Sequence, residues 1–275
     1  MNTTLDVHGI GIINACGRGI LPESDAEDRP EQPESGSGFR VDHVAAETLK
    51  DRVALKKLRR ADRFSKMSAL AAWDAAGNAA SLPQPAGTHP GIVVATAFGP
   101  HRTTFEFLDE ILDFGDGAVS PTKFSHSVHN AAAAYIAMML DSRGPACTVT
   151  DFRQPLYACL LTAAVWLQEK RCTHVLAGYT EEMSAPMEYI FNTRHGAGAL
   201  QAAQPFNLTP YRDAPASEGS LFLRLTLPGH GGTPLDINRF HGAERISGIT
   251  PLARYLASVG QAGSSTPTHT QRETT

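Results

Sequence analysis

Short apolar stretches alternate along the chain with longer segments whose apolar residues recur at helical spacing. The clearest helical period lies in residues 64–80, where Met67, Leu70 and Ala71 fall three or four positions apart. The apolar stretches predict strands at residues 5–13, 91–97, 146–150, 174–177 and 220–226. The periodic segments predict helices at residues 64–80, 103–114, 131–140 and 155–170. Strands that alternate with helices favour an α/β fold built in layers.

Two polar segments set the expected domain limits. Residues 22–38 carry six acidic residues against one arginine, with three prolines, which is typical of a solvated surface loop; binding of a basic partner is the alternative. Residues 260–275 are rich in Ser, Thr and Gly and are expected to be a disordered tail. We therefore expect a main domain over residues 1–228 and a short extension over 229–259, with one plausible strand at 234–240.

Charge and cysteine content narrow the classes of function. The net charge is −4 and the pI about 6.2, so nucleic acid is an unexpected partner. The longest uncharged apolar runs, 131–140 and 156–167, are too short to span a bilayer. Residues 1–17 contain no Lys or Arg, so they lack the basic N-terminal region of a signal peptide. The four cysteines form no C-x-x-C pair. We expect a cytoplasmic protein with free thiols.

Sequence motifs for familiar chemistry are few. Gly9 and Gly11 come close to a dinucleotide fingerprint, but the third glycine is missing, which favours a glycine-lined strand. His126 and His129 are three residues apart without a third candidate ligand, so we expect neither a metal nor a cofactor. Cys159 lies inside an apolar helix, where burial raises the pKa of a thiol and blocks access to it.

A basic stretch precedes the helix at 64–80. It comprises Lys56, Lys57, Arg59, Arg60 and Arg63. It is either a solvated surface or a docking site for an acidic carrier protein.

Seven segments, in order, resemble the N-terminal half of β-ketoacyl-acyl-carrier-protein synthases, which have the thiolase fold. They are VHGIG at 7–11, RADRF at 60–64, GIVVAT at 91–96, SPTKF through NAAA to GP over 120–145, TVT at 148–150, VLAG at 175–178 with Glu181 or Glu182, and PF at 205–206 with EGSLFL at 218–223. The resemblance covers about residues 5–227. It implies the N-terminal half of a thiolase-like fold, a layered α/β structure with a mixed, mostly parallel sheet.

Two departures from the family pattern bear on activity. Active synthases carry a nucleophilic cysteine where the strand at 146–150 runs into the next helix; counting back from Ala177 and Gly178 places Arg153 there, or Gln154 if the register slips by one. The family also continues into a second half with two histidines and a lysine, whereas only about 48 residues follow here. The resemblance therefore implies no catalytic residue in this chain.

These departures are similar to those of half-length, chain-length-factor-like proteins of type II polyketide systems that make aryl polyenes. Such a subunit would pair with an active ketosynthase in polyketide or fatty-acid-type chain elongation, and would meet the acyl carrier protein indirectly. The residues expected at the contact or the acyl tunnel are Asn130, Ile136, Thr150, Asp151, Phe152, Arg153, Gln154 and Tyr157. The helix over 156–167 is apolar nearly all round and needs cover from the C-terminal segment or from a partner. The alternatives are a stand-alone acyltransferase acting on acyl-carrier thioesters and a carrier-protein docking module.

Overall fold

The fold is taken from a computed structural model, which describes residues 3–14, 17–19, 44–50, 56–77, 88–152, 154–187, 189–190 and 218–240. The expected acidic loop at 22–38 and the expected tail at 260–275 lie outside these residues, as does the extension beyond residue 240.

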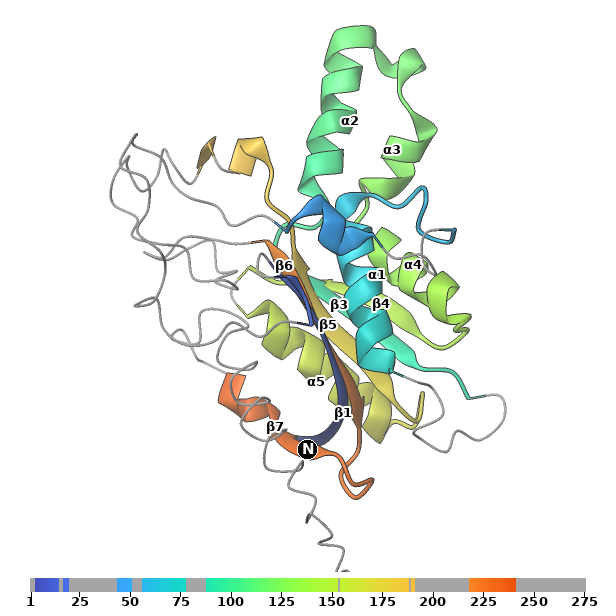
Figure 1. The fold of residues 1–275 in the computed structure, drawn as a ribbon, viewed down its shortest axis with the longest axis vertical. Helices are drawn as coiled ribbons and strands as arrows, with labels where there is room; N and C mark the ends of the chain where they lie inside the picture. The colour runs from blue at the N-terminus through green and yellow to red at the C-terminus, as the bar shows by residue number, and fades with distance from the viewer. Residues whose placement is uncertain are drawn as a thin grey trace, which may run out of the picture.

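One mixed sheet forms the centre of the molecule (Figure 1). Its strands are β1 (Thr4–Asn14), β2 (Gly17–Arg18), β3 (Gly91–Thr96), β4 (Ala146–Thr150), β5 (Val175–Glu181), β6 (Gly219–Thr226) and β7 (Thr233–Asp236). The order is β2-β1-β6-β5-β3-β4, and β7 pairs with β1. The layered α/β class is confirmed.

The proportion of parallel pairs differs from the expectation. Of the strand pairs described, β3 runs parallel to β4 and to β5, and the other four pairs are antiparallel. The prediction of a mostly parallel sheet was therefore wrong. The reason is that β6 enters antiparallel between β1 and β5, and β1 also pairs antiparallel with the short strands β2 and β7.

Helices cover both faces of the sheet (Figure 1). On one face α1 (Arg63–Ala76) and α4 (Ala131–Leu140) pack against Ile92, Val94 and Phe222. On the other face α5 (Pro155–Gln168) packs against the alternate residues Val93, Ala95 and their neighbours. The alternation along β3 sends successive side chains into two different cores, as a strand buried on both faces requires.

Local signals explain both ends of α1. The carboxylate of Asp62 caps α1 by accepting a hydrogen bond from the backbone N–H of Ser65 (3.3 Å), and α1 ends before Gly77, whose φ is +60°. The predicted helix at 64–80 therefore ends earlier, at Ala76. The bounds 131–140 and 146–150 match those predicted, whereas β5 continues to Glu181, beyond the predicted residue 177.

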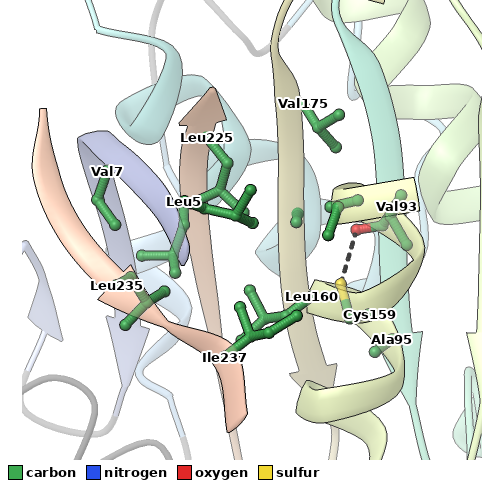
Figure 2. Packing of buried hydrophobic residues seen from close by; sticks show 14 of the residues in the cluster. Leu5, Val7, Val93, Ala95, Cys159, Leu160, Val175, Leu225, Leu235 and Ile237 are labelled. Carbon is green, nitrogen blue, oxygen red and sulfur yellow. Dashed lines mark hydrogen bonds between the residues drawn. The ribbon is translucent and has the colours of Figure 1, made fainter. Parts of the chain in front are cut away.

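The start of the C-terminal extension packs on the α5 face of the sheet. β7 ends at Asp236, and a 3₁₀ turn follows over Ile237–Phe240, so the strand expected at 234–240 is shorter than predicted. Leu235 and Ile237 are fully buried in the same cluster as Cys159 and Leu160 of α5 (Figure 2). This segment provides part of the cover that the apolar helix needs. Among the described residues, no helix has the length and apolarity needed to cross a membrane.

The glycines of β1 let α1 lie directly on the sheet. A Cβ added to Gly11 would collide with the backbone of Ala71 and Ala75, and one added to Gly9 with the backbone carbonyl of Ala75. Close helix–strand packing, not a nucleotide, explains these glycines.

We expect Gly11→Ala to lower the free energy of unfolding by about 1–3 kcal/mol in urea titrations, because the backbone of α1 must move. Gly117→Ala meets no atom within 4 Å and should change it by less than about 1 kcal/mol. Equal effects of the two changes would contradict this packing argument.

Candidate functional site

The site that the sequence singled out lies where the parallel strands end. β3, β4 and β5 run in the same direction, so their last residues, Thr96, Thr150 and Glu181, lie together at the carboxyl ends of the strands. Thr96 pairs with Thr150, and the backbone N–H of Asp151 donates to the carbonyl of Thr96 (3.2 Å). In open α/β sheets, ligands normally bind at the carboxyl ends of the strands.

The turn from β4 into α5 is fixed by the side chain of Asp151. Its Oδ1 accepts a hydrogen bond from the backbone N–H of Gln154 (2.8 Å), and α5 begins at Pro155. The start of a helix carries partial positive charge and exposed N–H groups. Gln154 directly precedes this helix start, and Arg153 lies outside the described residues.

An aromatic group flanks this turn. The ring of Phe152, half of which is exposed, packs edge-on against Phe98 with centroids 5.7 Å apart, and Phe98 packs against His101 at 6.2 Å. Sequence reasoning missed Phe98 and His101. Their only signal was the AFGPH segment directly after an apolar strand, and spacing along the chain does not reveal that it reaches the turn after β4.

Glu181 is buried beneath this region. Its carboxylate accepts hydrogen bonds from the hydroxyl of Thr96 (2.9 Å) and from the backbone N–H groups of Ala97 and Phe98. Burial outweighs these hydrogen bonds and raises the pKa of Glu181 to about 8.

Glu182 is also buried and binds the start of α2 (His101–Phe114), accepting a hydrogen bond from the backbone N–H of Arg102 (2.8 Å). Burial, followed by the nearby carboxylates of Asp62 and Glu218, raises its pKa to about 8. Burial lowers the pKa of His101 to about 4. Within the described part of the chain, Oε2 of Glu182 and Nε2 of His101 have no hydrogen-bond partner.

The described cysteines are poor nucleophiles. Cys159 is fully buried on α5, with Sγ 3.5 Å from the carbonyls of Val93 and Gly178, and burial raises its pKa far above the usual range (Figure 2). Burial also raises the pKa of Cys147 and of Cys172. A working thiol needs the opposite shift and access to substrate.

The remaining predicted contact residues separate into two groups. Thr150 and Asn130 are exposed, at the end of β4 and at the start of α4, and Tyr157 is half-buried in the first turn of α5. Ile136 is fully buried between α1 and α4 in the protein's own core, so the structure does not bring it to the surface with the others.

The basic stretch also divides. Lys56, Lys57, Arg59 and Arg60 are exposed, whereas Arg63 turns inward and binds both carboxylate oxygens of Glu218. Nε2 of His126 is hydrogen-bonded to the hydroxyl of Tyr135 (2.8 Å). In the described ranges, no group of three His, Cys, Asp or Glu residues is arranged to hold a metal ion.

A family model decides the identity. The model of the β-ketoacyl synthase N-terminal domain matches residues 40–208, more than half of the chain. The chain belongs to the β-ketoacyl synthase family. No curated protein sequence matches it.

Solved structures of ketosynthases share the fold. The ishigamide ketosynthase/chain length factor superposes with a TM-score of 0.60 at 18% identity, covering 85% of this chain and 65% of the other. A β-ketoacyl synthase from Burkholderia phymatum STM815 gives 0.61 at 17%, with 85% and 62% covered. A ketosynthase in complex with its chain length factor from Xenorhabdus doucetiae gives 0.52 at 16%, with 89% and 92% covered. This β-ketoacyl synthase-like chain thus spans slightly less than two thirds of the first two relatives.

Proposed function

We propose that this protein is a non-catalytic ketosynthase-like subunit that pairs with an active ketosynthase in polyketide-type chain elongation. The observation that carries the proposal is the β4–α5 turn, where the sequence resemblance places Arg153 or Gln154 at the position of the family's cysteine, next to the edge strand of the described sheet. An aryl polyene or related product is proposed on the sequence resemblance alone.

The cysteines in the described part of the chain support a non-catalytic role. Neither arginine nor glutamine can form a thioester with an acyl chain, and covalent acyl transfer requires a side-chain nucleophile that takes up the acyl group. Cys147, Cys159 and Cys172, the described thiols, are buried or half-buried with raised pKa values. Rapid acylation of any cysteine of this chain by an acyl-carrier thioester would instead favour the stand-alone acyltransferase.

The exposed edge of the sheet supports pairing with another protein. Among the strands that the structure describes, β4 is the last of the sheet order, and its first and last residues, Ala146 and Thr150, are exposed. Two backbone hydrogen bonds show which residues of β4 face β3. The N–H of Ile92 donates to the carbonyl of Pro145, and the N–H of Asp151 donates to the carbonyl of Thr96. In a parallel pair such residues alternate, so the N–H groups of residues 146, 148 and 150 face outward. An open edge of this kind is a template for pairing with another strand.

Apolar side chains continue the contact surface beyond the strand. Phe152 follows β4 directly, and α2 carries Phe105, Leu108 and Leu112 exposed at helical spacing. The turn before α4 lies against β4 through the hydroxyl of Thr148, which donates to the carbonyl of His129 (3.2 Å). Exposed apolar patches on a soluble protein usually mark an interface. We infer that the partner ketosynthase covers β4, Phe152 and the stripe on α2.

The native mass of the purified protein, alone and co-expressed with a ketosynthase from the same gene neighbourhood, tests this proposal. We expect a stable one-to-one complex and expect Thr150→Pro to weaken it at least tenfold, because proline removes an outward N–H and leaves the pairing with β3 intact. Thr150→Val keeps that N–H and should bind as the wild type does. A well-behaved monomer that ignores the synthase would overturn the proposal.

Docking of an acyl carrier protein is a second candidate function. Four basic residues are exposed within a five-residue segment: Lys56, Lys57, Arg59 and Arg60. Nζ of Lys57 donates to the carbonyls of Met138 and Met139 at the end of α4 (both 3.0 Å). Carrier proteins are acidic, so such a cluster would steer their approach.

The paired reversal Arg59→Glu with Arg60→Glu should lower the affinity for the carrier protein of the same gene neighbourhood at least tenfold at low salt. Lys170→Glu, at an exposed position just beyond the end of α5, is the control. Calorimetric titration at two salt concentrations measures both. Equal affinity of the two variants would remove this candidate.

A further inference from the structure

Helices α2 and α3 (Pro121–His126) form an arm, residues 101–126, that projects from the body of the protein (Figure 1). Within the described structure, α2 packs mainly against α3 and against the short turn Asp116–Ala118. Its buried residues are His101 and Thr103, both in its first turn. The arm is therefore attached to the sheet chiefly through its base.

Two consecutive carboxyl groups hold this base. Glu181 binds the backbone N–H groups of Ala97 and Phe98 on the segment that leads into α2, and Glu182 binds the backbone N–H of Arg102 within the first turn. Thr96 completes the set, because its hydroxyl donates to Glu181 and accepts from the N–H of Gly99 (2.8 Å). The chain between the sheet and the arm is thus fixed at residues 97, 98, 99 and 102.

Carboxyl groups are costly in this position. Both side chains are almost completely buried, and the charged groups near Glu182 include two further carboxylates, Asp62 before α1 and Glu218 before β6, as well as Arg102. Glu181 has the buried hydroxyl of Tyr179 as an additional neighbour. Buried acids are normally paired with a cation, and Oε2 of Glu182 has no partner in the described structure. The arrangement is hard to explain as a device for stability.

We propose that Glu181 and Glu182 are positioning residues that clamp the base of the α2–α3 arm and so fix the direction of its exposed stripe, Phe105, Leu108 and Leu112. The inference rests on the proposed function for its biological meaning, since the stripe belongs to the proposed ketosynthase interface. The clamp itself is a property of the single chain.

Ionisation works against the clamp. Burial raises the pKa of each carboxyl to about 8, so the closed base favours the protonated forms. Above that pH the carboxylates gain free energy by reaching water, and an opened arm base allows this. The arm should therefore loosen between pH 7 and pH 9 while the sheet stays folded.

Hydrogen exchange on the isolated chain tests the clamp without any partner. We expect Glu182→Ala to raise corrected exchange rates at residues 103–114 at least tenfold at pH 7, with β3 and α5 unchanged. Glu182→Gln keeps an oxygen acceptor for Arg102 and should restore protection, and Glu169→Ala, an exposed site, is the control. Unchanged arm protection in Glu182→Ala, or equal loss in arm and sheet, would overturn the proposal.

The wild-type chain provides a second, independent measurement if Glu182→Ala does not fold. Protection of the arm relative to β3, corrected for intrinsic exchange, should fall at least tenfold from pH 7 to pH 9. A constant ratio would overturn the clamp. Both measurements use the lone chain, so failure to bind a ketosynthase would refute the proposed function and leave the clamp standing.

Discussion

Glu218→Gln is expected to destabilise the protein by about 3–5 kcal/mol, the usual cost of breaking a buried ion pair by removing one partner. Glu218 is fully buried, and both of its oxygens are in use. Oε1 accepts from Nη2 of Arg63 and from the N–H of Val44 (2.9 Å), while Oε2 accepts from Nε of Arg63 (2.9 Å) and from the N–H of Met183 (3.2 Å).

A glutamine in this position cannot satisfy the same donors. Its NH₂ group must replace one of the two oxygens, and each oxygen faces two N–H donors. Arg63 would also keep its charge, with its side chain only 19% exposed. Urea unfolding followed by far-UV circular dichroism measures the loss. Glu47→Gln removes an exposed pair with Lys50 and should cost less than about 1 kcal/mol. A loss below about 1 kcal/mol for Glu218→Gln would mean that the pair is not a structural support.

Arg63 and Glu218 also show what the sequence could predict. Both belong to segments that resemble ketosynthases, RADRF and EGSLFL, so their presence was informative. Their pairing across 155 positions was not predictable, because nothing local distinguishes Arg63 from the exposed Arg59 and Arg60 beside it. Tertiary contacts decide which residue of a basic stretch turns inward.

The sheet shows the same difference: the positions of its elements follow from local sequence, whereas the direction of its strands depends on distant contacts. Turn and helix signals around residues 131–150 located α4 and β4 correctly, since both ends of each element are marked in the sequence. The direction of β6 depends on how the chain returns to the sheet, and no local pattern encodes it. The overestimate of parallel pairing arose there.

The sequence could predict the turn at the candidate site. It could not predict which residues from other parts of the chain pack around that turn. Asp151, Phe152 and Gln154 share the β4–α5 turn because a strand followed by a helix places them together. Ile136 was assigned to the partner contact or the acyl tunnel together with Asn130, yet it is fully buried in the core between α1 and α4. Phe98 and the environment of Glu181 depend on the pairing of β3 with β4 and β5.

The stability of the protein should fall as pH rises from 6.5 to 8. Glu181 and Glu182 have pKa values of about 8 in the folded state against 4.5 when unfolded, so the folded state holds protons that the unfolded state has released. Their contribution is complete below pH 4.5 and is lost as pH rises through 8. His101 and His174 act in the opposite sense, since burial lowers their pKa from 6.5 to about 4 and stability is lost as pH falls through that range.

Among these four groups, the two effects oppose each other between pH 4.5 and 6.5, and the carboxyl effect dominates between pH 6.5 and 8. Over that upper interval, two such groups should lower the free energy of unfolding by about 3 kcal/mol, because each pH unit is worth about 1.4 kcal/mol per proton. Urea titrations at half-unit steps measure the slope, with a shallow maximum expected below pH 6.5. Glu182→Gln removes one titrating group and should halve the slope, whereas Glu169→Gln, an exposed acid, should leave it unchanged. A flat profile from pH 6.5 to 8 would mean that both carboxyls ionise in the folded state without cost, and the argument that burial sets the chemistry of the arm base would fail with it.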